Sequence, residues 1–179
     1  MKFLLAFVRI VDALNERVGR AVAWLVLAAV LVSAGNAIMR YSLNLSSNAW
    51  LEIQWYLFSA IFLLGAGYAL KKNAHVRIDV IAGRLSKRHQ ALIDIVGGLA
   101  FLLPMSLIIL WLSVPMFWQS YAGGEISADA GGLIRWPVKL LIPVGFMLLT
   151  LQGLAEIAKR VAFLRGAAPE PFETPPDQY

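Results

Sequence analysis

The chain has 179 residues, of which 59% are hydrophobic and 15% are charged, and its formal net charge is +5. So high an apolar fraction lies outside the range of water-soluble domains of this size and predicts a membrane protein. The cations stand beside apolar segments, where membrane insertion explains them, so the basic charge does not indicate nucleic-acid binding. The chain has no cysteine, which excludes disulfides, thiolate nucleophiles and cysteine-bound metals.

An amphipathic pattern comes first along the chain. Over residues 1–20, apolar side chains recur at steps of three and four, and charged side chains occupy much of the other face. The apolar run is too short for a secretory signal and is interrupted by Arg9 and Asp12. We therefore predict an amphipathic interfacial helix on the cytoplasmic surface of the membrane.

Four uncharged stretches follow, each close to the roughly 20 residues that cross a hydrocarbon core about 30 Å thick. They are continuously apolar and do not alternate, which excludes the strands of a lipid-facing barrel. The sequence predicts an all-α integral membrane protein with four transmembrane helices, at about residues 21–39, 53–70, 95–118 and 138–156. Residues 21–159 then form one four-helix membrane domain.

The segments between and after the spans carry further local signals. Ser86 is a candidate N-cap for the third span, and residues 78–85 are expected to form a short cytoplasmic surface helix. Prolines inside the spans predict kinks. The outer loop 120–137 is rich in glycine and is expected to be flexible, and residues 160–179 have the composition of a disordered cytoplasmic tail. The span prolines are Pro104, Pro115 and Pro143.

The cations also predict the orientation of the chain. With alternating crossings, thirteen of the sixteen Lys and Arg residues fall on one side of the membrane and three on the other. By the positive-inside rule the rich side is cytoplasmic, so both termini are expected in the cytoplasm.

Small residues mark the first two spans, with Ala29, Ser33 and Ala37 in the first and Gly65 and Gly67 in the second. Such residues let helix backbones approach closely in a membrane. They predict either packing within this chain or docking of another membrane subunit.

The spans hold no ionisable residue in their central portions, which argues against an enzyme or a self-sufficient carrier. His75 and His89 both lie in the cytoplasmic loop, which excludes haem held between helices, and with Asp79 they match no metal motif. We expect no enzymatic activity, no cofactor and no metal. Glu52 lies at a span boundary, where it could form an ion pair with Arg40 across the first outer loop. The alternative is a carboxylate that couples ion movement, as in small exporters, but such a group is expected in the middle of the bilayer.

Three stretches together resemble one family: Glu52–Phe58, Phe62–Leu70, and the sequence Asn73-x-His75-Val76-Arg77-Ile78-Asp79. They are similar to the small permease subunit, of DctQ type, of tripartite ATP-independent periplasmic (TRAP) transporters. Residues 48–52 and 131–139 further resemble the branch described for mannitol or chloroaromatic-type substrates. That label is loose, and carboxylates, including 2-oxo acids, fit the branch at least as well.

The resemblance implies a three-part system in the bacterial inner membrane. A periplasmic binding protein captures an organic acid, and a separate large permease subunit takes it up with sodium by an elevator mechanism. The small subunit steadies the large one. The alternative is a self-sufficient, oligomeric four-helix carrier or exporter.

Eight residues are candidate structural or subunit-contact positions, and none is expected to be catalytic. Five belong to the stretch that carries the resemblance, and three lie near the outer surface, where the large subunit or the binding protein could touch. They are Glu52, Trp55, His75, Arg77 and Asp79, and then Arg135, Trp136 and Pro137.

Overall fold

The computed structural model describes residues 2–44, 47–74 and 85–167. The described chain is almost entirely helical, and four of its helical segments are long and apolar enough to cross a membrane, which confirms the predicted class. The segments are α1 (Lys2–Leu43), α2 (Asn48–Lys71), the continuous run α4 (Lys87–Gly97), η1 (Gly98–Leu102) and α5 (Leu103–Ala122), and α6 (Trp136–Leu164).

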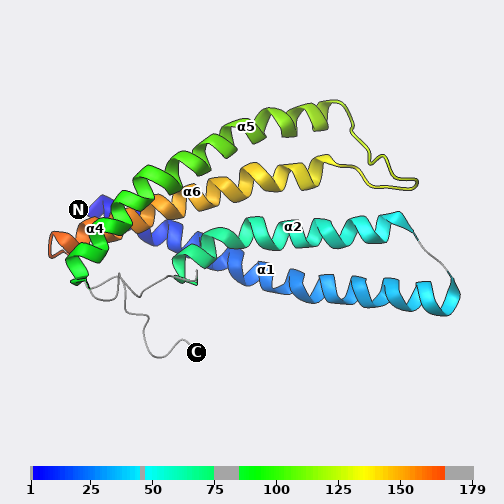
Figure 1. The fold of residues 1–179 in the computed structure, drawn as a ribbon, viewed down its shortest axis with the longest axis horizontal. Coiled ribbons are helices and arrows are strands. Elements are labelled where there is room, and N and C mark those ends of the chain that lie inside the picture. Colours follow the sequence, from blue (N-terminus) through cyan, green and yellow to red (C-terminus); the bar gives the residue numbers. More distant parts are fainter. Residues whose placement is uncertain (1, 45–46, 75–84, 168–179) are drawn as a thin grey trace.

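The helices lie side by side in one row rather than around a central axis (Figure 1). The order across the row is α1, α2, α6 and α5, so two antiparallel hairpins meet along α2 and α6. α6 holds more of the buried residues than any other helix, because it has a neighbour on each side and also meets α1 at one end. The other helices keep large apolar side chains exposed along their lengths.

α1 is one continuous helix of 42 residues. At 1.5 Å per residue it is about 63 Å long, roughly twice the thickness of a hydrocarbon core. Its first half is therefore not a separate helix, and part of its apolar face packs on α6, where Val8 and Val11 meet Ala155 and Ala158. The interfacial position of residues 1–20 stays a prediction.

The third span contains a π-helical turn, η1, just before Pro104. There the Leu103 N–H bonds to the carbonyl of Gly98, five residues earlier. Proline has no N–H and clashes with the preceding turn of an α-helix, and the wider π turn relieves that clash. The departure from regular helix that the sequence predicts at Pro104 takes this form.

Small residues allow the closest helix contacts within the chain. A Cβ added to Gly145 of α6 would lie 2.6 Å from the carbonyl oxygen of Leu63 in α2, and one on Gly19 of α1 would lie 2.3 Å from the Tyr68 ring. At these positions the small residues serve packing within the chain. Gly35 differs, since nothing lies within 4 Å of its added Cβ.

Two sequence predictions fall wholly or mainly outside the described residues. Of the expected surface helix at 78–85, residues 78–84 are not described, and of the expected tail, residues 168–179 are not described. α6 itself continues to Leu164, past the predicted start of the tail. Ser86 is the N-cap residue of α4, although its hydroxyl contacts the Nδ1 of His89 at 2.7 Å and makes no capping bond.

Candidate functional sites at the two ends of the helix layer

Residues 123–135 form a closed hairpin between α5 and α6. Ile126 and Ile134 make an antiparallel bridge, the Ser127 N–H donates to the Leu133 carbonyl at 2.9 Å, and the Arg135 N–H donates to the Glu125 carbonyl at 2.9 Å. Gly131 makes the tip of this hairpin possible, because its φ of +72° is a conformation that residues with a Cβ rarely adopt. The glycine-rich composition predicted a flexible loop, whereas the structure holds it by hydrogen bonds.

Glu52 joins this hairpin to α2. The residue is 2% exposed, and its carboxylate accepts hydrogen bonds from the Ser127 hydroxyl and from the Leu133 N–H, the latter at 2.6 Å. The sequence suggested Arg40 as its partner. The structure gives it the hairpin instead, because the loop folds back over the first turns of α2.

Further bonds tie the hairpin to both neighbouring helices. The Asn48 amide donates to the Ala130 carbonyl at 3.1 Å, and the Tyr56 hydroxyl donates to the Ile134 carbonyl at 2.9 Å. Lys139 of α6 forms an ion pair with Glu125. This contact with the ammonium holds the pKa of Glu125 below its ordinary value.

The structure brings together three of the predicted site residues at this end. Trp55 lies one turn from Glu52 and lines a shallow cavity of about 290 Å³ together with Arg135. The Arg135 guanidinium donates to the Ser127 hydroxyl at 3.2 Å, so it reaches the same hairpin as Glu52.

The remaining predicted residues are placed differently. Trp136 begins α6 and packs edge-on against Tyr121 of α5, with ring centroids 5.5 Å apart, and Pro137 lies in the same first turn. His75, Arg77 and Asp79 lie outside the described residues.

The opposite end of the layer holds a buried polar network between α1 and α6. Asn15 and Gln152 are both 0% exposed, and the Asn15 amide donates to the Gln152 side-chain oxygen at 2.9 Å. The Gln152 amide in turn donates to Asp12 at 2.8 Å and to Glu156 at 3.0 Å. One glutamine thus joins side chains of two helices that are far apart in sequence.

Two cations of α6 continue this network. Lys159 bridges Asp12 at 2.9 Å and Glu156 at 2.7 Å. Arg160 is 4% exposed, and its guanidinium donates to Asp94 of α4 at 2.8 Å and to Glu156 at 2.7 Å. The network therefore ties α1 and α4 to the same end of α6.

Sequence reasoning missed this network because it treated residues 159–160 as the start of a charged flank. A signal was present. Gln152, Glu156, Lys159 and Arg160 recur at steps of three and four, which places them on one face of a helix. Asp12, Asn15 and Glu16 have the same spacing.

The two sites have one physical character in common. In the described ranges no group of three or more His, Asp or Glu side chains could hold a metal ion. Each site uses buried hydrogen bonds and ion pairs to join helices or a loop, and between them lie apolar side chains. The geometry is that of a framework whose ends are tied by polar contacts.

Comparison with known proteins agrees with this picture. The model of the family described as tripartite ATP-independent periplasmic transporters, DctQ component, matches residues 29–163, from the middle of α1 to the end of α6. The chain is 26% identical over 136 residues to the C4-dicarboxylate TRAP transporter small permease protein DctQ of Pseudomonas aeruginosa. That match covers 73% of this chain, which spans about three fifths (61%) of the length of the relative. No solved structure matches the chain at a comparable level. The chain therefore belongs to the DctQ component family of TRAP transporters and is a multi-pass membrane component of a transport system, not an enzyme.

Proposed function

We propose that this subunit is a scaffold for a separate large permease subunit. The observation that carries the proposal is the single row of helices, which leaves broad apolar surfaces on α1, α2 and α5. Hydrophobicity does not drive helix association in lipid, so a specific contact there depends on shape and hydrogen bonds. Polar contacts at both ends of the row hold the helices that carry these surfaces in fixed positions relative to one another, ready for a partner.

The transport system then takes up an organic acid with sodium, after a periplasmic binding protein delivers it. Membership in a tripartite transporter family supports the partners, and the printed name of the relative, a C4-dicarboxylate small permease protein, supports an organic acid. The resemblance to the mannitol or chloroaromatic-type branch stays a prediction about substrate.

We further propose that both termini face the cytoplasm. The start of α1 and the end of α6 lie at the same end of the layer (Figure 1), and the cation count favours the cytoplasm as the location of that end. The hairpin would then face the periplasm, where Arg135, Trp136 and Pro137 could meet the binding protein or the large subunit. A reporter fused after Tyr179 tests this, because activity specific to the periplasm would overturn the orientation.

Reconstitution tests the scaffold role against the alternative of a self-sufficient carrier. Proteoliposomes would contain this chain alone, the large subunit alone, or both, each with the binding protein and a sodium gradient. We expect uptake only when both membrane subunits are present. Sodium-driven uptake by this chain alone would establish the alternative and overturn the scaffold.

The residues of the matching cytoplasmic stretch, His75, Arg77 and Asp79, are proposed as subunit contacts. Arg77→Ala and Asp79→Ala should reduce co-purification of the large subunit more than they alter the substrate profile of the complex. Unchanged co-purification with a changed profile would count against this role.

A further inference from the structure

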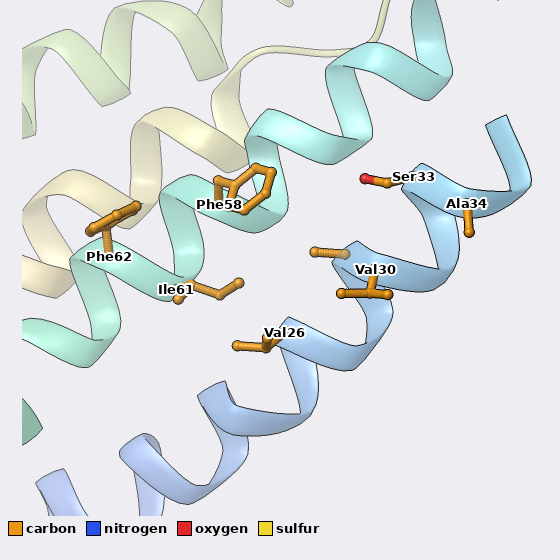
Figure 2. Close-up of a pocket in the computed structure, with 8 residues that line it drawn as sticks. Val26, Val30, Ser33, Ala34, Phe58, Ile61 and Phe62 are labelled. Atoms are coloured by element: carbon orange, nitrogen blue, oxygen red, sulfur yellow. The ribbon is translucent and has the colours of Figure 1, made fainter. Parts of the chain in front are cut away.

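An open apolar groove runs between α1 and α2 on one surface of the layer (Figure 2). Its volume is about 650 Å³. Ala29 forms a buried floor at 2% exposure, whereas Val30 and Phe62 are 58% and 76% exposed. From Val26 to Ala34, the α1 side of the groove rises about 12 Å, which matches the 10–12 Å diameter of one crossing helix.

The groove also contains one hydroxyl group that the described part of this chain does not satisfy. The side chain of Ser33 lines it beside Ala34 (Figure 2). Across the described ranges, the Ser33 side chain takes part in no hydrogen bond. A hydroxyl thus lies in an apolar groove of a membrane helix with no partner from the described part of its own chain.

Three other hydroxyl groups in the membrane helices behave differently. Ser59 donates to the Trp55 carbonyl at 2.8 Å, Ser113 to the Leu110 carbonyl at 3.0 Å, and Thr150 to the Phe146 carbonyl at 2.7 Å. Such a bond within the helix is the usual way to satisfy a hydroxyl in hydrocarbon. Because Ser33 does not make it, its hydroxyl is available to a molecule that fills the groove.

We propose that one transmembrane helix of the large permease subunit fills this groove and hydrogen-bonds to Ser33. The proposal rests on the scaffold function proposed above and names the surface that performs it. Lipid tails could fill the apolar volume but have no group to pair with the hydroxyl, and an unpaired polar group is costly in hydrocarbon. The small side chains of Ala29, Ser33 and Ala34 allow the close approach that such an interhelical bond needs.

Photo-cross-linking from Val30 tests the location of the large subunit. A benzophenone amino acid would replace Val30 in the full complex, assembled in membranes, and a second variant would carry it at Leu112 of α5. Leu112 is a matched control, because it is 64% exposed against 58% for Val30. It lies ten residues, about 15 Å, from the end of α5, and Val30 lies thirteen residues, about 20 Å, from the end of α1. We expect an adduct between this chain and the large subunit from Val30, at least fivefold stronger than from Leu112.

Three outcomes would overturn the proposal: an adduct between two copies of this chain, equal adducts from both positions, or no adduct from Val30 while the subunits still co-purify. If the unsubstituted chain does not co-purify with the large subunit at all, the scaffold function itself fails.

A pair of substitutions tests the hydrogen bond independently of cross-linking. Ser33→Thr keeps the hydroxyl, and Ser33→Leu removes it and fills the groove. We expect Ser33→Leu to lower the recovered large subunit at least fivefold while Ser33→Thr stays within twofold of the unsubstituted chain. Circular dichroism and elution volume of each variant, purified alone, verify that it folds. Equal recovery with both variants would exclude Ser33 as a contact.

Discussion

The side chain of Asn15 in α1 packs directly on Gly67 in α2, so that a Cβ added to Gly67 would lie 2.2 Å from the Asn15 Oδ1. The same Asn15 donates to Gln152 of α6. Three helices therefore meet at one buried amide, and Gly67 is required there for space. Asn15 Oδ1 has no conventional hydrogen-bond donor in the described structure, and its contact is with the glycine backbone.

Gly67→Ala should destabilise the subunit by about 1–3 kcal/mol, the usual effect of overpacking a close contact. The new methyl would also lie 3.3 Å from the Leu148 carbonyl oxygen, so it cannot move away from Asn15 without approaching α6. Titration of the detergent-solubilised protein with SDS measures the loss. Gly35→Ala is the control, because nothing lies within 4 Å of its added Cβ. Equal effects of the two substitutions would contradict the packing argument.

Gln152→Leu should cost about 1–3 kcal/mol, because it leaves buried polar groups of α1 without their partner. The expected signature is local. Amide exchange should accelerate in the first half of α1, where Asp12 and Asn15 lie, before it does so in α2. Gln54→Leu is the matched control, since the Gln54 side chain makes no hydrogen bond within the described ranges. No change in α1 would show that Gln152 does not hold this helix.

Arg160→Met should destabilise more strongly, by about 3–5 kcal/mol, because two partly buried carboxylates lose their shared cation. Replacing Asp94 and Glu156 as well, in the variant Asp94→Asn, Glu156→Gln, Arg160→Met, should recover part of the loss. Thermal unfolding in detergent compares the two. A triple variant that is less stable than the single one would mean that the carboxylates contribute through other contacts.

Glu52→Gln should loosen the outer hairpin while leaving the helices intact. The substitution places an amide where a carboxylate now accepts two hydrogen bonds, so one contact is lost or reversed. We expect the Leu133 amide to exchange at least tenfold faster. Glu16→Gln, the same change at the other end of the layer, should leave that amide unaffected. Unchanged exchange in Glu52→Gln would show that the hairpin is held by its other bonds.

The hairpin should also respond to pH through Glu125. Its pKa is lowered by Lys139, so the ionised carboxylate is favoured in the folded protein. The contribution of this pair is complete above the ordinary carboxyl value of 4.5 and is lost as the pH falls through the depressed pKa. The protection factors of the hairpin amides, which correct each exchange rate for its intrinsic dependence on pH, should therefore fall on acidification. Glu125→Gln should remove this part of the profile, and an unaltered profile would exclude Glu125 as its source.

The sequence predicted the four spans well because continuous apolar stretches bounded by charge report directly on membrane crossing. The predicted ends of the spans were less exact. α2 begins at Asn48 rather than near residue 53, and the third span extends to Ala122 rather than ending near 118. Polar residues continue these helices beyond the apolar stretches. There hydrogen bonds, and not hydrophobicity, determine where each helix ends.

The candidate sites depended more on contacts between distant residues. Glu52 was identified from its place in a family-like stretch, but its partners Ser127 and Leu133 are 75 and 81 positions away. The network around Gln152 was missed because residues 12 and 152 have no local relation that sets their distance. Helical spacing could have placed each set on a face, but not the two faces against each other.

By itself, the sequence determined the class, the number of crossings and the family resemblance, since composition, run length and local motifs are properties of neighbouring residues. Only the tertiary structure decided that the helices stand in a row, that Gly67 makes room for Asn15, and that Ser33 lines an open groove without a hydrogen bond of its own. Such relations arise from how helices pack, and packing depends on shape and hydrogen bonding between segments that the linear order does not bring together.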